Sequence, residues 1–146
     1  MKRRVPQLVA LCVCCCFLNA CMTYKVVQLF QATSVVEGFF GALNSGEIKT
    51  AVGFYADTMR QSVGDAVLEE GLRRDVERFG VFVDYKTRSW RLEEGPNEGK
   101  QLVLVCEVVY EQGITHEVFV ISVGGAEKIL SHEIKSERFT GGRFEI

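Results

Sequence analysis

The chain has 146 residues, of which 47% are hydrophobic and 25% are charged, and its formal net charge is −2. This length suits one domain with a hydrophobic core that needs no crosslinks. Beyond residue 4 the chain has no basic run, no repeat and no low-complexity tract. The composition therefore argues against nucleic-acid binding and against an internal linker.

The first 21 residues have the order of an export signal: a basic start, an apolar run over residues 5–18 and a small residue before a cysteine. The tetrapeptide Leu18-Asn19-Ala20-Cys21 resembles the cleavage motif of bacterial lipoproteins. The resemblance implies that lipid is attached to Cys21 and that a signal peptide, residues 1–20, is removed. The alternative is an uncleaved signal anchor, because residues 5–22 approach the minimum length of a membrane span.

Processing at Cys21 would have four consequences for the mature chain. Loss of the three basic residues at positions 2–4 would take the net charge from −2 to about −5. Met22 is not an aspartate, so the resemblance implies anchoring in the outer membrane where a cell has two. Of the six cysteines, only Cys106 would remain without lipid, and it has no disulfide partner. Residues 21–25 would form the lipidated end and a short tether.

Helical periodicity dominates the first half of the mature chain. Apolar residues recur at helical spacing before Asn44-Ser45-Gly46, which predicts the end of a first helix. Ser62 and Asp65 are spaced as a capping box, which predicts the start of another helix that runs to Gly80. Three helices are expected, over residues 25–44, 47–56 and 62–80.

After Gly80 the hydrophobic period changes to two, which is typical of strands. Strands are expected over residues 81–93, 101–112, 115–123 and 127–139. Turn signals separate them, and Gly124-Gly125 predicts a two-residue hairpin. Three helices followed by a strand meander predict an α+β domain over residues 26–146, with the helices packed on one face of a four-stranded antiparallel sheet.

Residues 46–57 (GEIKTAVGFYAD) resemble the segment after the first helix in the nuclear-transport-factor-2-like superfamily, which includes SnoaL-type cyclases and ketosteroid isomerases. Residues 39–46 and 117–121 are similar to its exported lipoproteins of unknown function. The resemblance implies a strongly curved, cone-like sheet with a pocket. In the isomerases a tyrosine on the first helix and an aspartate after the Tyr-Ala-Asp carry the reaction. This chain has Phe39 at the position of that tyrosine, and it has no aspartate over residues 58–63.

Four residues are candidates for binding: Tyr55, Asp57, Trp90 and Tyr110. Packing and a turn cap also explain Tyr55 and Asp57, because one ends an apolar helix face and the other lies where a helix is expected to stop. Trp90 lies near the end of the first strand, where a pocket mouth, an interface or core packing would each suit it. If the protein is an enzyme, Asp84 joins Tyr55, Asp57 and Tyr110 as an acid–base candidate. No catalytic residue is assigned.

The remaining reactive side chains have structural interpretations. Cys106 lies on the apolar face of the second strand, which predicts a buried hydrophobe and not a nucleophile. With a hairpin at 124–125, His116 faces Glu133 and Glu117 faces His132, and the two histidines lie on opposite sides of the sheet. We therefore expect no metal site, and each pair is interpreted as a cross-strand contact worth a few tenths of a kcal/mol.

These features favour a membrane-anchored cell-envelope lipoprotein whose domain binds a ligand or partner without catalysis. The alternative is a small cone-fold enzyme of the isomerase, dehydratase or cyclase type. Besides the lipid on Cys21, the expected partner is a membrane or envelope protein or a small apolar ligand, with no cofactor, metal or nucleic acid. A cavity with a buried carboxylate beside a tyrosine or histidine would favour the enzyme.

Overall fold

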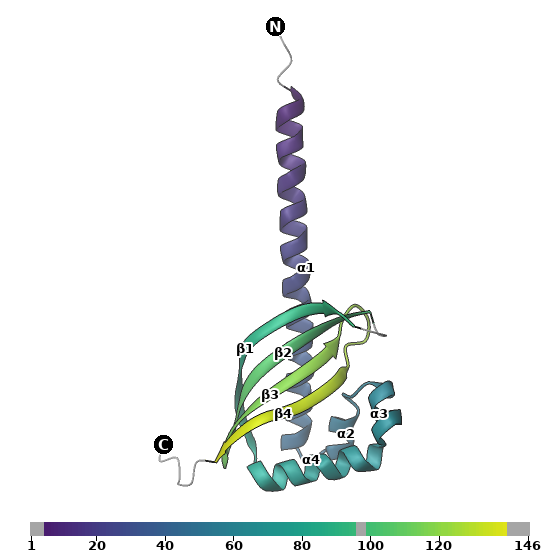
Figure 1. Cartoon of the computed structure of the whole chain (residues 1–146), viewed down its shortest axis with the longest axis vertical. Coiled ribbons are helices and arrows are strands. Elements are labelled where there is room, and N and C mark those ends of the chain that lie inside the picture. Colours follow the sequence, from purple (N-terminus) through teal and green to yellow (C-terminus); the bar gives the residue numbers. More distant parts are fainter. Residues whose placement is uncertain (1–4, 96–98, 140–146) are drawn as a thin grey trace.

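The computed structural model describes the backbone of residues 5–95 and 99–139, and the side chains of residues 24–95 and 99–135. Within these residues, four helices precede four strands (Figure 1). The strands form one antiparallel sheet in the order β1-β2-β3-β4. The expected α+β class, with the helices before the sheet, is confirmed. The elements are α1 (Val5–Asn44), α2 (Ile48–Val52), α3 (Asp57–Val63), α4 (Asp65–Phe79), β1 (Phe82–Glu94), β2 (Lys100–Tyr110), β3 (Gly113–Ser122) and β4 (Ile129–Phe139).

Helix α1 is 40 residues long, which at 1.5 Å per residue gives a length of about 60 Å. Its first half projects away from the domain and its second half lies against the sheet (Figure 1). Residues 21–25 are helical in this uncleaved chain. The segment Tyr24–Asn44 is long and apolar enough to cross a membrane, a property that signal sequences and core helices share. Cleavage before Cys21 and lipidation stay predictions.

The helix boundaries differ from expectation around Gly64. The expected second helix is confined to α2, and a separate helix, α3, follows it. Gly64 has a φ of +92°, a conformation that favours glycine, and it separates α3 from α4. The capping box is wrong, because the Ser62 hydroxyl donates to the Met59 carbonyl at 3.0 Å and Asp65 binds Arg60. Periodicity alone did not reveal this break, since apolar spacing continues across it.

The strand bounds agree closely with expectation, but the last hairpin does not. β3 pairs with β4 in a register that places Phe119, not Glu117, opposite His132. The connection covers residues 123–128 because the Ser122 side chain accepts a hydrogen bond from the Lys128 N–H at 2.9 Å. The two-residue hairpin at 124–125 is therefore wrong. The two histidines still lie on opposite sides of the sheet, as expected.

Residues 54–56 run beside the start of β4 and fix the position of Tyr55. The Ile129 N–H donates to the Phe54 carbonyl at 2.9 Å, and the Ala56 N–H donates to the Ile129 carbonyl at 2.9 Å. These two bonds form a short parallel bridge to the edge strand. Tyr55 is thereby held against β4, next to the inner face of the sheet.

The core lies between α1 and the inner face of the sheet. Phe40 stacks on Phe82 with 4.2 Å between ring centroids, and Phe39 meets Phe119 edge-on at 6.0 Å. The apolar face expected for β2 is confirmed, because Cys106 and its alternate neighbours are all buried. The core runs from Leu29 to Ile134. Residues 23–146 therefore contain every described core side chain and should fold on their own.

Candidate functional site

A carboxylate lies in the middle of the buried face of β3. Because successive strand residues point to opposite sides, Glu117 shares the inner face with Thr115, Phe119 and Ile121. All four side chains are fully buried. An ionised carboxylate in such surroundings costs a large free energy of transfer from water unless hydrogen-bond donors and charges compensate it.

Three side chains supply that compensation. Oε1 of Glu117 accepts hydrogen bonds from the hydroxyls of Tyr110 at 2.9 Å and Thr115 at 2.5 Å. Oε2 lies 2.7 Å from Nε2 of His132. Since Tyr110 lies on β2 and His132 on β4, the carboxylate joins three neighbouring strands. We call these residues, together with Tyr55, the Glu117 network.

The electrostatics of this network favour an ionised Glu117. Burial raises the pKa of Glu117, but the hydrogen bond and charge of His132 and the two hydroxyl groups outweigh burial and hold the pKa below its usual value. The pKa of Tyr110 is raised far above its usual value, first by burial and then by Glu117. Tyr110 therefore stays protonated and serves as a donor.

His132 connects the carboxylate to Tyr55. Its ring stacks on Phe119 with 4.2 Å between centroids and meets Phe39 edge-on at 5.5 Å. Its Nδ1 lies 3.2 Å from the Tyr55 hydroxyl. A neutral imidazole that donates through Nε2 to Glu117 and accepts through Nδ1 from Tyr55 satisfies both contacts. The histidine side chain is 9% exposed, so this network reaches the protein surface at His132.

At that point a cavity of about 370 Å³ opens between α3, α4 and β4. Tyr55, Asp75 and His132 form its polar part, together with Glu133. Burial, followed by the charges of Asp75 and then Glu117, raises the pKa of Tyr55. Burial also raises the pKa of Asp75: His132 opposes this rise, Glu117 adds to it, and Arg78 and Arg74 oppose it more weakly. The rest of the wall is mostly apolar: Met59, Val67, Leu68, Gly71, Leu72 and Ile134.

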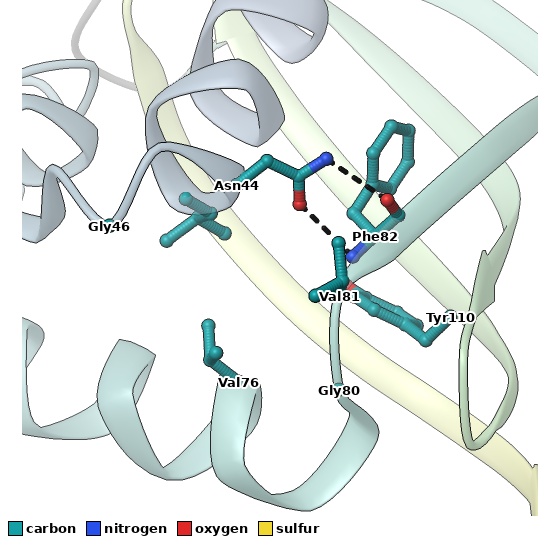
Figure 2. A pocket seen from close by; sticks show the side chains of 8 residues that line it. Asn44, Gly46, Val76, Gly80, Val81, Phe82 and Tyr110 are labelled. Carbon is teal, nitrogen blue, oxygen red and sulfur yellow. Dashed lines mark hydrogen bonds between the residues drawn. The ribbon is translucent and has the colours of Figure 1, made fainter.

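Another cavity, of about 200 Å³, is shown in Figure 2. It lies at the Tyr110 end of the Glu117 network. The ring of Tyr110 lines it, while the Tyr110 hydroxyl reaches Glu117. Asn44 closes one side, because its Nδ2 donates to the Phe82 carbonyl at 3.0 Å and its Oδ1 accepts from the Phe82 N–H at 3.1 Å. Gly80, with a φ of +79°, forms the opposite rim. The network thus lies between two cavities.

The structure brings together two of the four candidate binding residues. Tyr55 and Tyr110 are linked through His132 and Glu117. Asp57 begins α3 instead of ending a helix, is 86% exposed and pairs with Arg60 at 3.5 Å. Trp90 is 38% exposed on β1, outside the network.

Two further residues, Asp84 and Cys106, have side chains for which the sequence suggested either a chemical or a structural role. Asp84, the additional acid–base candidate, is exposed and accepts a hydrogen bond from the Tyr85 N–H at 2.8 Å, away from either cavity. Cys106 is fully buried, and burial raises the pKa of its thiol to about 11. The interpretation of Cys106 as a buried hydrophobe is confirmed.

Sequence reasoning missed Glu117, His132 and Asp75 as site residues. The Glu117–His132 pair was expected, but as a weak cross-strand contact and with the wrong register. A signal was available: Glu117 stands at an alternate position between Thr115 and Phe119, so period two already places it among inward-facing residues. Asp75 likewise follows Leu68 and Leu72 at helical spacing on the buried side of α4.

Among the described side chains, no group of three or more His, Cys, Asp or Glu residues could hold a metal ion. The side chain of Cys21, the expected lipidation site, lies outside the described residues. No protein-family model, curated protein or solved structure matches this chain. The candidate site is therefore defined by its geometry: a buried, ionised network that ends in a cavity with apolar walls.

Proposed function

We propose that this chain is a cell-envelope lipoprotein, anchored by lipid on Cys21, whose domain binds a small and largely apolar ligand. The observation that carries the proposal is the cavity between α3, α4 and β4, with its apolar wall and its few polar groups. Sites for small molecules commonly combine these two features. The cavity volume, about 370 Å³, lies at the lower end of the range for such sites.

The state of the polar groups favours binding over catalysis. Both ring nitrogens of His132 already have partners, Glu117 and Tyr55. The raised pKa of Tyr55 disfavours the phenolate that a tyrosine base would need. These groups are therefore arranged to hold fixed hydrogen bonds at the cavity wall.

Two features of α1 support the membrane anchor. The export-type leader occupies its first half, which projects away from the sheet (Figure 1). Just after Cys21, four large apolar side chains of α1 are exposed, which suits a location at the lipid headgroups. They are Tyr24, Val26, Val27 and Phe30. Delivery to the outer membrane, where there are two membranes, follows from Met22 as an expectation of the lipoprotein resemblance.

We also propose that the domain is a cone of the nuclear-transport-factor-2-like type. Register shifts occur twice in the β1–β2 pairing and twice in the β3–β4 pairing. Such irregularities bend strands and increase twist, as a strongly curved sheet requires. The order of helices before a four-stranded meander is a second point of agreement.

The binding proposal can be tested by filling the cavity. Gly71 lines it, and a Cβ at Gly71 would meet no atom within 4 Å, so Gly71→Leu should occupy the space without a clash. Residues 23–146 with labelled methyl groups are titrated with cyclohexylmethanol, and the Met59, Leu68 and Ile134 methyl signals are followed by NMR. We expect shifts in wild type and none in Gly71→Leu. Shifts that persist in Gly71→Leu, or their absence in wild type, would overturn the proposal.

Gly41→Leu is the matched control for that experiment. Gly41 is also helical and also has open space around its Cβ position, but it is exposed on α1 and outside the cavity. It should bind cyclohexylmethanol like wild type. Leucine also has a higher helix propensity than glycine, so neither substitution should lower the melting temperature.

Asp75, half-buried beside Tyr55 and His132 at the cavity, meets in part the condition stated for an enzyme and favours a second function, an enzyme of the isomerase, dehydratase or cyclase type. Glu117, His132 and Tyr55 form a carboxylate–imidazole–hydroxyl chain that ends at the cavity, beside the half-buried Asp75. Such a chain can carry a proton between a ligand and the protein. If it does so, residues 23–146 should accelerate exchange of the α-protons of cyclohexanone in D₂O, and His132→Ala should abolish the acceleration.

A further inference from the structure

The charges around the cavity between α3, α4 and β4 identify the chemical class of its ligand. This inference rests on the binding proposal above. Asp75 lies on the wall among apolar residues, and no described side chain forms a hydrogen bond or an ion pair with its carboxylate at contact distance. A half-buried carboxylate in such a wall is stabilised by a cation that binds beside it.

The neighbouring cations of α4 have other contacts. Arg73 pairs with Glu69 at 3.1 Å, and Arg74 pairs with Glu70 at 3.4 Å. The guanidinium of Arg78 lies 5.3 Å from the centre of the Phe79 ring. The charges of Arg74 and Arg78 lower the pKa of Asp75, but burial outweighs them. None of the three arginines lines the cavity, whereas Asp75 does.

The residues of β4 at the cavity carry no positive charge that lacks a negative partner. Glu133 is paired with Lys135, and His132 is paired with the buried carboxylate of Glu117. Lys135 balances the charge of Glu133, and a His132 that accepts the hydrogen bond from Tyr55 is neutral and adds no positive charge. With Asp75 added, the wall carries a net negative charge, which disfavours an anionic ligand and favours a cationic one.

The hydrogen-bonding groups fit an ammonium ion in particular. An ammonium group has three donors and no acceptor. Asp75 can accept one hydrogen bond, and the oxygen of Tyr55 can accept another while its own proton is donated to His132. An apolar body attached to the nitrogen would then lie along Leu68, Leu72 and Ile134.

We infer that this cavity binds a small primary amine with an apolar body, and that Asp75 is the residue that selects the amine over neutral and anionic molecules of the same shape. The selection is electrostatic, so it should weaken as the salt concentration rises. The alcohol can also donate to the carboxylate of Asp75, but only the ammonium adds the attraction of opposite charges, which predicts a preference of about tenfold or more for the amine.

Three probes with one shared body test the inference: cyclohexylmethylamine, cyclohexylmethanol and cyclohexanecarboxylate. Their dissociation constants for residues 23–146 are measured by calorimetry at pH 7 and low salt. The amine should bind at least tenfold more tightly than the alcohol, and the carboxylate should bind more weakly than either. Asp75→Asn should reduce the preference for the amine to less than twofold, and alcohol binding that remains measurable, because an amide oxygen also accepts a hydrogen bond, shows that the variant is folded.

Glu77→Gln is the matched control, because Glu77 is an exposed carboxylate on the same helix and does not line the cavity. It should keep the order of the three probes. If all probes bind equally and Gly71→Leu blocks them, the binding proposal holds and the assignment of an amine fails. An amine preference that survives in Asp75→Asn also overturns the assignment. If no probe binds to wild type, both proposals fail.

Discussion

Nε2 of His132 lies 2.7 Å from Oε2 of Glu117, and the carboxylate of this pair is fully buried while the imidazole is 9% exposed. A buried pair of this kind gains little net stability from its formation, but removal of one member leaves the other without a partner. Removal of one member should therefore lower the free energy of unfolding by more than the pair contributes to it.

Glu117→Gln should destabilise the domain by about 3 kcal/mol. The amide cannot accept from Tyr110, Thr115 and His132 together, because one of its two polar atoms is a donor. Urea unfolding of residues 23–146 measures the change. Glu107→Gln is the comparison, since its exposed pairing with Arg88 predicts a loss below about 1 kcal/mol. Equal losses in the two variants would contradict the role of burial.

The free energy of unfolding should depend on pH through the ionisation of Glu117. The pKa of Glu117 is lower in the folded protein than its usual value of 4.5. A carboxyl with a lowered pKa stabilises the fold at pH values above its unfolded pKa, and this contribution is lost as the pH falls through the folded pKa. The difference in unfolding free energy between wild type and Glu117→Gln should therefore be constant near pH 7 and shrink below about pH 4.5. A difference that is unchanged at pH 3 would contradict this prediction.

The sequence could predict the strands but not the environment of Glu117. Strand bounds depend on local alternation and on glycine turns, which are readable from neighbouring residues. The register of the last hairpin depends on Ser122 closing a wider loop and on Ile129 pairing with residues 54–56. The first is a side-chain contact within the loop and the second joins segments far apart in the chain, so a rule based on turn residues alone selected the wrong register.

The sequence predicted only part of the candidate site, because it shows residue types but not the contacts between strands. Tyr55 and Tyr110 stood out by residue type, but their connection requires His132 to lie inward beside Phe119, which follows from the observed register. The burial of Glu117 is visible in the alternation of β3. Its three donors come from three strands, and only the folded sheet brings them together.

Asp75→Asn should stabilise the domain at neutral pH. Burial raises the pKa of Asp75 in the folded protein, and a carboxyl with a raised pKa destabilises the fold at pH values above its unfolded pKa. Removal of the charge should raise the unfolding free energy by up to about 1 kcal/mol, as substitutions that relax functional sites often do. Thermal unfolding at pH 7 and pH 4 measures this. The gain should be larger at pH 7, and a loss of stability at pH 7 would show that Asp75 has a stabilising partner.

Cys21→Ser should abolish lipid attachment when the full chain is produced in a bacterium that is fed a palmitate analogue. A single acyl chain holds a protein only marginally, whereas several hold it firmly, so the variant should also leave the membrane or accumulate uncleaved. Mass spectrometry of wild type should show loss of residues 1–20 and added lipid on Cys21. Cys16→Ser, a cysteine within the apolar leader, should be labelled and cleaved like wild type. If wild type instead keeps residues 1–20 and carries no label, α1 is an uncleaved signal anchor. In that case the lipoprotein assignment fails, while the cavity and its ligand can still be tested separately with residues 23–146.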